Sequence, residues 1–244
     1  MHTILFTIGS LSFYTHGVFA VIGIILSAVL LYFLAQSRNL DSSYVFDNVI
    51  YSVLAGIIGA RLTFSILYYN QLPSFVHIFY FWEGGLVSYG GFVFGGIAFL
   101  LLLKKQGQNI LNWFDLLGIS FPLGLFMGRL GEYVSGENFG VGTTVLGAVN
   151  KQVPINLYEA FLCLAISIIL FIIYTKLKNR IKPGFIFALS VLFYSAGRFV
   201  IDFWRVEKDL LSILSLGQVV SLLLFVIALV TLFSQYRPKR REVL

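Results

Sequence analysis

The chain has 244 residues, of which 58% are hydrophobic and 11% charged, and its mean hydropathy is +0.89. These proportions exclude a water-soluble globular protein and predict a chain embedded in a lipid bilayer. The net charge of +6 does not indicate nucleic-acid binding, because no basic stripe interleaved with aromatic residues lies outside the short loops. The single cysteine, Cys163, lies in an apolar run, so neither a disulfide framework nor a metal-binding Cys/His cluster is expected.

Apolar runs predict an all-α integral membrane protein with seven transmembrane helices in a single polytopic domain, residues 1–244. The start of the chain lacks the features of a cleaved signal peptide, so the first apolar run is expected to be a retained span. The third and fourth spans are expected to be shorter than the others. In chain order, the expected spans are 17–35, 45–68, 89–104, 113–128, 156–175, 183–204 and 213–233.

Basic residues predict the orientation of these spans. Positively charged residues accumulate in short cytoplasmic connections, and 11 of the 17 Lys and Arg fall in alternate connections and the C-terminal tail. We therefore expect the N-terminus outside and the C-terminus in the cytoplasm, with the tail 237–241 as an anchor for anionic lipid. The eleven residues are Arg38, Lys104, Lys105, Lys176, Lys178, Arg180, Lys182, Arg237, Lys239, Arg240 and Arg241.

The remaining basic residues lie in the outward loops or at the outward ends of the spans, and several carboxylates gather at the same level. Ionisable groups at membrane depth are costly unless they are paired or hydrated, so this layer predicts a polar cavity open toward the outer leaflet. The alternative is structural pairing near helix ends, with side chains reaching water. The residues of this layer are Arg61, Arg129, Lys151, Arg198, Arg205 and Lys208, with Glu83, Glu132, Glu137, Glu159 and Asp202.

The densest group of these residues lies in Gly128–Gly140, directly after the fourth expected span. Its glycines permit tight turns, so the segment is expected to be a structured polar loop. Arg129 at its start offers a fork of donors that matches phosphate oxygens. The alternative is a flexible outer loop in which Arg129 pairs with Glu132 or Glu137.

Two further segments carry polar residues at regular spacing. Tyr194, Arg198, Asp202 and Arg205 are four, four and three residues apart, which predicts one polar face of the sixth span, lining the same cavity. An internal Arg198–Asp202 salt bridge is the alternative.

Before the third span, the stretch 82–91 contains four glycines and would let a ligand approach near Tyr89. Close helix packing is the alternative there, and it also accounts for Gly95 and Gly96. The aromatic stretch 75–82 is expected either as an interfacial element beside the cavity or as an ordinary aromatic belt.

At these residues the chain resembles a known family. Gly128–Gly140 is similar to the signature of bacterial prolipoprotein diacylglyceryl transferases, GR-x-GNF-x-NGE-x-x-G. In the family's order, Trp82–Gly91 resembles W-D/E-GG-x-x-x-HGG, Pro154–Glu159 resembles P-x-QLYE, and Tyr194–Arg205 resembles YG-x-x-RF-x-x-E-F-x-R. The stretches 14–17 and 59–61 also resemble the family's aromatic-Gly start of the first span and its GGR in the second.

Several polar positions depart from that pattern. Tyr89 stands where the family has a histidine, Glu132 and Ser135 replace two asparagines, Asn156 replaces a glutamine, and Asp202 replaces a glutamate. The family's charged residues are otherwise kept at Arg129, Glu137, Glu159, Arg198 and Arg205.

The resemblance implies transfer of a diacylglyceryl group from phosphatidylglycerol to the lipobox cysteine of a prolipoprotein, which releases glycerol phosphate and leaves a thioether. It implies a multi-pass protein of the bacterial cytoplasmic membrane with its active site toward the outer face. No metal, nucleotide cofactor or nucleic-acid partner is expected, and we expect a monomer.

The resemblance also assigns roles. Arg129, Arg198 and Arg61 are expected to bind the phospholipid, and Arg198, Tyr89, Glu137 and Glu132 to take part in catalysis. The supporting residues are Tyr158, Glu159, Asp202 and Arg205.

The identity of the proton acceptor stays open, because Tyr89 replaces the family's histidine and a tyrosine is a poorer base near neutral pH than an imidazole. Tyr89 or Glu132 could serve, or an arginine-rich field could favour the substrate thiolate. His16, at the outward end of the first span, is the fourth candidate, although a lone histidine there is more often an interfacial residue.

Three other functions would also explain part of the sequence pattern. A transporter or channel would also place charges in a membrane cavity, but such proteins often show internal repeats, and none is visible here. A non-catalytic lipid-binding relative would keep the arginines and lose the base. A related transferase would use another lipid donor or acceptor.

Overall fold

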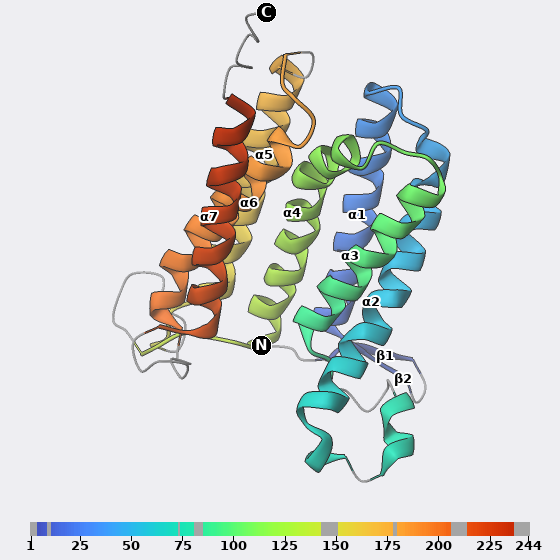
Figure 1. Ribbon diagram of the computed structural model, residues 1–244. Helices are drawn as coiled ribbons and strands as arrows, with labels where there is room; N and C mark the ends of the chain where they lie inside the picture. The colour runs from blue at the N-terminus through green and yellow to red at the C-terminus, as the bar shows by residue number, and fades with distance from the viewer. Residues whose placement is uncertain are drawn as a thin grey trace, which may run out of the picture. The chain divides into compact units, whose positions relative to one another are not determined.

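Seven α-helices dominate the computed structural model, which describes residues 4–8, 11–72, 74–80, 85–142, 151–177, 180–205 and 214–236 (Figure 1). Seven helices are long and apolar enough to cross a membrane, which confirms the expected fold class. Glu83, Trp82, Lys178, Lys208 and the tail 237–241 lie outside the described residues. The helices are α1 (Thr15–Ser37), α2 (Val45–Leu67), α3 (Ser88–Lys105), α4 (Ile110–Ser135), α5 (Ile155–Leu177), α6 (Phe185–Ile201) and α7 (Leu216–Tyr236).

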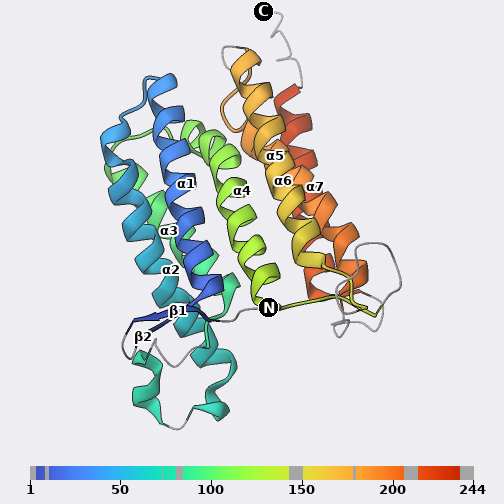
Figure 2. The same ribbon diagram turned by 180° about the vertical axis from the view of Figure 1, so that it is seen from behind.

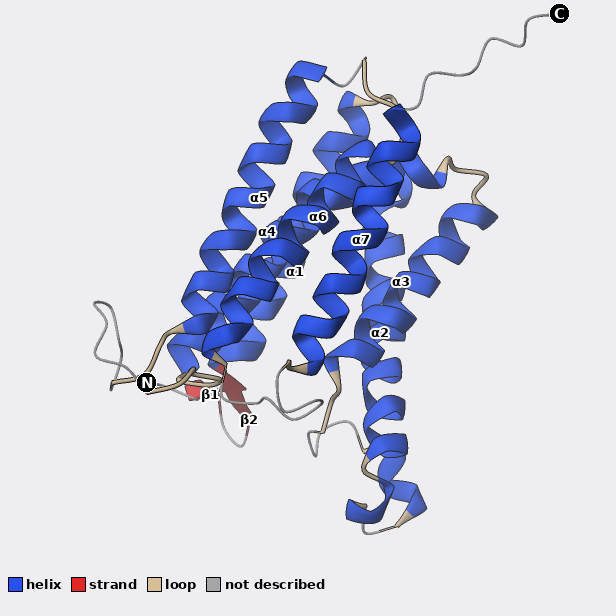
Figure 3. Ribbon diagram, turned by 60° about the vertical axis from the view of Figure 1, so that its left-hand side comes forward, coloured by secondary structure: helices blue, strands red, loops and turns tan. Residues whose placement is uncertain are grey.

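A β-hairpin precedes the first helix. Strands β1 (Ile4–Ile8) and β2 (Leu11–Tyr14) pair antiparallel, and the rings of Phe6 and Phe13 stack across them with centroids 4.6 Å apart. The hairpin leads directly into α1 (Figure 2). Among the described residues these are the only strands, as Figure 3 shows, and the sequence analysis did not anticipate them.

Short 3₁₀ turns occupy several connections. They are η1 (Ser42–Tyr44), η2 (Tyr69–Gln71), η3 (Phe75–Phe79) and η5 (Asp202–Trp204). The turn η3 covers most of the aromatic stretch that was expected to be an interfacial element or an aromatic belt, and both interpretations stay predictions.

The fourth helix corrects two expectations. It contains 26 residues and runs to Ser135, so it is not short, and Arg129 lies on its last turns rather than in a loop. Gly136 (φ +83°) ends the helix, and its N–H bonds back to the carbonyl of Glu132. Gly131 serves helix packing instead of a turn, because a Cβ there would lie 2.6 Å from the Cβ of Phe19 in α1. The predicted loop is therefore confined to the residues after Ser135.

Contacts within the chain form two compact units, Met1–Leu31 with Phe114–Leu244 and Tyr32–Trp113. We call them the larger and the smaller unit. In the larger unit, α6 packs against both α5 and α7 (Figure 1). The single membrane domain expected from the sequence stays a prediction.

In the smaller unit, α2 packs closely against α3. A Cβ on Gly90 would lie 2.1 Å from Thr63 Oγ1, and a Cβ on Gly95 would lie 2.9 Å from the carbonyl oxygen of Ser52. A Cβ on Gly96 would have no heavy atom within 4 Å. Close helix packing therefore explains Gly90 and Gly95, but not Gly96.

Candidate active site

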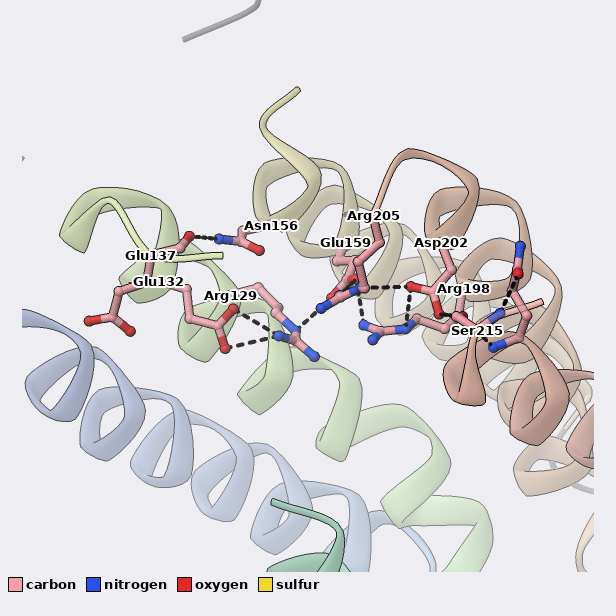
Figure 4. A network of polar contacts seen from close by, with 10 residues as sticks. Arg129, Glu132, Glu137, Asn156, Glu159, Arg198, Asp202, Arg205 and Ser215 are labelled. Carbon is pink, nitrogen blue, oxygen red and sulfur yellow. Dashed lines mark hydrogen bonds and ion pairs between the residues drawn. The ribbon is translucent and has the colours of Figure 1, made fainter. Parts of the chain in front are cut away.

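Six charged side chains of the larger unit meet in one network (Figure 4). They come from the last turns of α4, the first turns of α5, the end of α6, the 3₁₀ turn that follows it and the residue after that turn. We call this network the arginine–carboxylate cluster. Its members are Arg129, Glu132, Glu159, Arg198, Asp202 and Arg205.

Glu159 is the common partner of all three arginines. Its side chain is fully buried, and its Oε1 accepts from Nη1 of Arg198 and, at 2.9 Å, from Nη2 of Arg205. Its Oε2 lies 2.7 Å from Nε of Arg129. That contact is an ion pair without hydrogen-bond alignment, because Oε2 accepts no hydrogen bond from any described residue. One buried carboxylate thus holds three guanidinium groups together.

Asp202 is a second buried carboxylate. Its Oδ1 lies 3.2 Å from Nε of Arg198 and 3.0 Å from Nε of Arg205. Its other oxygen, Oδ2, accepts a hydrogen bond from Oγ of Ser215, the residue before α7, at 3.5 Å. A Cβ on Gly217 would lie only 2.2 Å from the same oxygen, so the site requires glycine there.

The polar face expected on the sixth span is only partly helical. The helix α6 ends at Ile201, and Asp202 begins the 3₁₀ turn η5, with Arg205 in extended backbone beyond it. The structure still brings Arg198, Asp202 and Arg205 together, because each arginine turns its Nε to Asp202. The Arg198–Asp202 salt bridge that was weighed as an alternative is present, within the larger cluster.

Arg129 pairs with Glu132 as well as with Glu159. Its Nη1 lies 2.9 Å and 2.8 Å from the two oxygens of Glu132, one helical turn away. The expected alternative partner, Glu137, turns its carboxylate away from Arg129 (Figure 4). Glu137 instead accepts a hydrogen bond from Nδ2 of Asn156 through its backbone carbonyl.

Each arginine of the cluster keeps one terminal nitrogen that makes no hydrogen bond with any described residue. These atoms are Nη2 of Arg129, Nη2 of Arg198 and Nη1 of Arg205, and the three side chains are 22%, 13% and 20% exposed. Guanidinium donors in this number are typical of sites that bind phosphate or carboxylate oxygens. The cluster can therefore bind an anion without breaking its internal ion pairs.

Three other expected site residues are not members of the arginine–carboxylate cluster. Tyr158 precedes Glu159 on α5 and is 37% exposed, whereas Tyr89, 53% exposed, lies in α3 of the smaller unit. Arg61, also in the smaller unit, is buried, and it donates to the backbone carbonyls of His77, Ile78 (3.2 Å) and Gly85 (3.4 Å). The cavity expected around the charged layer stays a prediction.

The residues at the start of α7 belong to the site although none of the family's motifs pointed to them. Ser215 Oγ accepts from the N–H of Gln218 at 3.1 Å, and Gln218 Oε1 accepts from the N–H of Ser215 at 3.0 Å. This reciprocal pair is a capping box, and the Ser-x-x-Gln spacing before an apolar run is its signal in the sequence. The cap places Ser215 beside Asp202.

No group of three or more His, Cys, Asp and Glu side chains in the described part of the chain could hold a metal ion.

Comparison with known proteins gives a match over almost the entire chain. Residues 3–234 match the family model described as prolipoprotein diacylglyceryl transferase. A phosphatidylglycerol–prolipoprotein diacylglyceryl transferase of Symbiobacterium thermophilum is 32% identical over 246 residues, which cover 92% of this chain and 89% of that protein. Proteins of the same description from Streptococcus equi subsp. zooepidemicus and Clostridium novyi are 28% and 30% identical, and the alignments cover 98% and 94% of this chain and 97% and 94% of theirs.

Proposed function

This chain belongs to the prolipoprotein diacylglyceryl transferase family, and we propose that it transfers a diacylglyceryl group from phosphatidylglycerol to the lipobox cysteine of a prolipoprotein. The observation that carries this proposal is the set of three arginines around Glu159, each with a terminal nitrogen left for a further anion. The substrates implied by the family are a membrane phospholipid and the signal peptide of a prolipoprotein. We propose that the protein acts as a monomer in the bacterial cytoplasmic membrane, with its site toward the outer face.

The reaction replaces a carbon–oxygen bond by a carbon–sulfur bond. The thiol loses its proton, and the sulfur attacks the glyceryl carbon attached to the phosphate. The bond from that carbon to the phosphate oxygen breaks with both electrons on the oxygen, so that glycerol phosphate leaves with one more negative charge. Preorganised cationic donors at the departing oxygen stabilise this developing charge most effectively in a water-poor site.

We assign the phosphate to Arg129 and Arg198. Each can offer a terminal nitrogen while its other donors hold Glu159, Glu132 or Asp202. Because the carboxylates fix the guanidinium groups before the lipid arrives, little reorganisation accompanies the chemical step.

The other roles follow the family's motif positions. Glu137 orients the segment after α4, and Glu159, Asp202, Arg205 and Tyr158 support the arginines. By their motif positions, we propose that Arg61 contributes to phospholipid binding and that Tyr89 and Glu132 take part in catalysis. These assignments rest on the family resemblance and not on measured proximity.

The test compares native protein with Arg129→Ala in detergent or nanodiscs that contain phosphatidylglycerol and a lipobox peptide. Thioether formation is followed by mass spectrometry, with Arg180→Ala as the control, because Arg180 is an exposed arginine outside the cluster. Loss of one donor to a developing oxyanion costs about 100- to 1,000-fold in turnover, so we expect Arg129→Ala to fall in that range and Arg180→Ala to match native protein.

Folded native protein that forms no thioether would overturn the proposal. If that protein still bound phosphatidylglycerol, the result would favour a lipid-binding relative without catalysis. This second function is favoured by Tyr89, because a tyrosine stands where the family has a histidine.

A further inference from the structure

The carboxylates of the cluster are poor candidates for the proton acceptor that the reaction needs. Both oxygens of Glu132 accept from Arg129, Glu159 is shared by three arginines, and Asp202 by two. The oxygens of these carboxylates thus already face guanidinium donors. A side chain with a polar atom that has no such partner is a better candidate.

His16, in the first turn of α1, has an unusual buried atom. Its Nδ1 is buried and makes no hydrogen bond with any residue that the structure describes, while the residue as a whole is only half-buried. Buried polar atoms of native proteins are nearly always paired, and the exceptions call for an explanation such as a catalytic role. The imidazole is also the side chain best suited to accept a proton near neutral pH.

The position of His16 places it next to the charged turn of α4. A Cβ on Gly131 would lie 3.3 Å from the Cα of His16, so the backbones of α1 and α4 are in close contact there. The residue after Gly131 is Glu132, the partner of Arg129. All of these residues belong to the larger unit.

The other histidines are less suited. His77 belongs to the smaller unit, and its ring packs against Tyr80 at 4.8 Å. His2 lies outside the described residues. Within the described part of the larger unit, His16 is the only imidazole.

We propose that the imidazole of His16 accepts the proton of the lipobox thiol, in place of the histidine that the family has at the position of Tyr89. The inference rests on the proposed transferase function. As the thiol proton moves to the imidazole, the sulfur forms its bond to the glyceryl carbon and the phosphate departs with the bonding electrons. The imidazolium then returns its proton to water or to the released phosphate monoester.

The experiment measures thioether formation by native protein, His16→Ala, His16→Gln and the control His77→Ala, each checked for folding by its thermal transition in detergent. Removal of a general base costs about 100- to 10,000-fold in turnover. We expect both His16 variants to lose kcat within that range while they bind phosphatidylglycerol vesicles like native protein. Added imidazole should restore the turnover of His16→Ala at least in part, and His77→Ala should stay at the native rate.

The two variants keep the test decisive if one of them fails to fold. The inference is overturned if either folded variant keeps more than about a tenth of native kcat, a smaller loss than removal of a general base causes. It is also overturned if turnover and lipid binding are lost together, or if imidazole restores nothing, because His16 would then have a structural role. Native protein without activity would overturn the transferase proposal and this inference with it, whereas active native protein with active His16 variants would overturn this inference alone.

Discussion

The buried carboxylate of Glu159 lies between three positive charges that would otherwise repel one another. Arg129, Arg198 and Arg205 all contact it, and it is fully buried, whereas among the described residues Glu132 forms an ion pair with Arg129 alone and is 14% exposed. Removing one partner of a buried ion pair leaves an uncompensated charge in a medium that solvates it poorly. Removal of the Glu132 charge takes one ion-pair partner from one arginine, and Arg129 keeps its pair with Glu159.

Glu159→Gln should therefore destabilise the protein far more than Glu132→Gln. We expect the free energy of unfolding to fall by about 3–5 kcal/mol for Glu159→Gln and by less for Glu132→Gln, which leaves Arg129 its pair with Glu159. Denaturant unfolding in detergent, followed by circular dichroism, measures both. Equal losses for the two variants would show that Glu159 is not the central partner of the arginines.

Glycines decide how closely the helices pack. In the smaller unit, a Cβ on Gly95 would lie 2.9 Å from the carbonyl oxygen of Ser52 in α2, and neither backbone can move aside without shifting a helix. The adjacent Gly96 meets nothing within 4 Å. These neighbours on α3 thus share their sequence context and differ only in what they face.

Gly95→Ala is expected to lower the stability of the protein, and Gly96→Ala is not. Gly95→Ala should lower the thermal transition temperature because α3 must move away from α2, and overpacking of this kind costs about 1–3 kcal/mol. Gly96→Ala should leave the transition unchanged or raise it, because alanine is favoured over glycine in a helix by about 1 kcal/mol. Thermal unfolding of the two variants side by side is the measurement, and a stable Gly95→Ala would contradict the described α2–α3 contact.

The seven helices all expose large apolar side chains, as expected for surfaces that face lipid tails instead of water. Examples are Val21 on α1, Phe92 on α3 and Leu223 on α7, which are 56%, 53% and 59% exposed. The buried positions include charged residues such as Glu159 and Asp202. Polar groups in a membrane protein collect inside because hydrocarbon offers them no partners.

The basic connections predict which loops face the cytoplasm, and this can be tested by labelling introduced cysteines. In intact cells, a membrane-impermeant maleimide should label Ser74→Cys, in an expected outer loop, and should label Lys105→Cys only after lysis. Both positions are exposed, and the native thiol of Cys163 is buried, which keeps the background low. Labelling of Lys105→Cys from outside would reverse the proposed orientation.

Local composition was sufficient to predict the seven spans, because a run of apolar residues long enough to cross hydrocarbon is favoured there whatever its neighbours are. The motif residues also pointed to the family and to Arg129, Arg198 and Glu159 before any geometry was known. The glycines of Gly128–Gly140 were less informative, because a glycine suits a turn and a close helix contact equally well. Only the neighbouring helix α1 shows that Gly131 is a packing position.

The partners within the cluster depended on the tertiary structure. Glu159 is 39 residues from Arg198 and 46 from Arg205 along the chain, and spacing within one helix cannot predict contacts at that distance. The packing of α5 against α6, with the turn η5 and the capped start of α7, brings these charges together. Sequence therefore determined which charges the protein carries into the membrane, and tertiary packing decided which charge neutralises which, because ion pairing depends on distance in space and not on order along the chain.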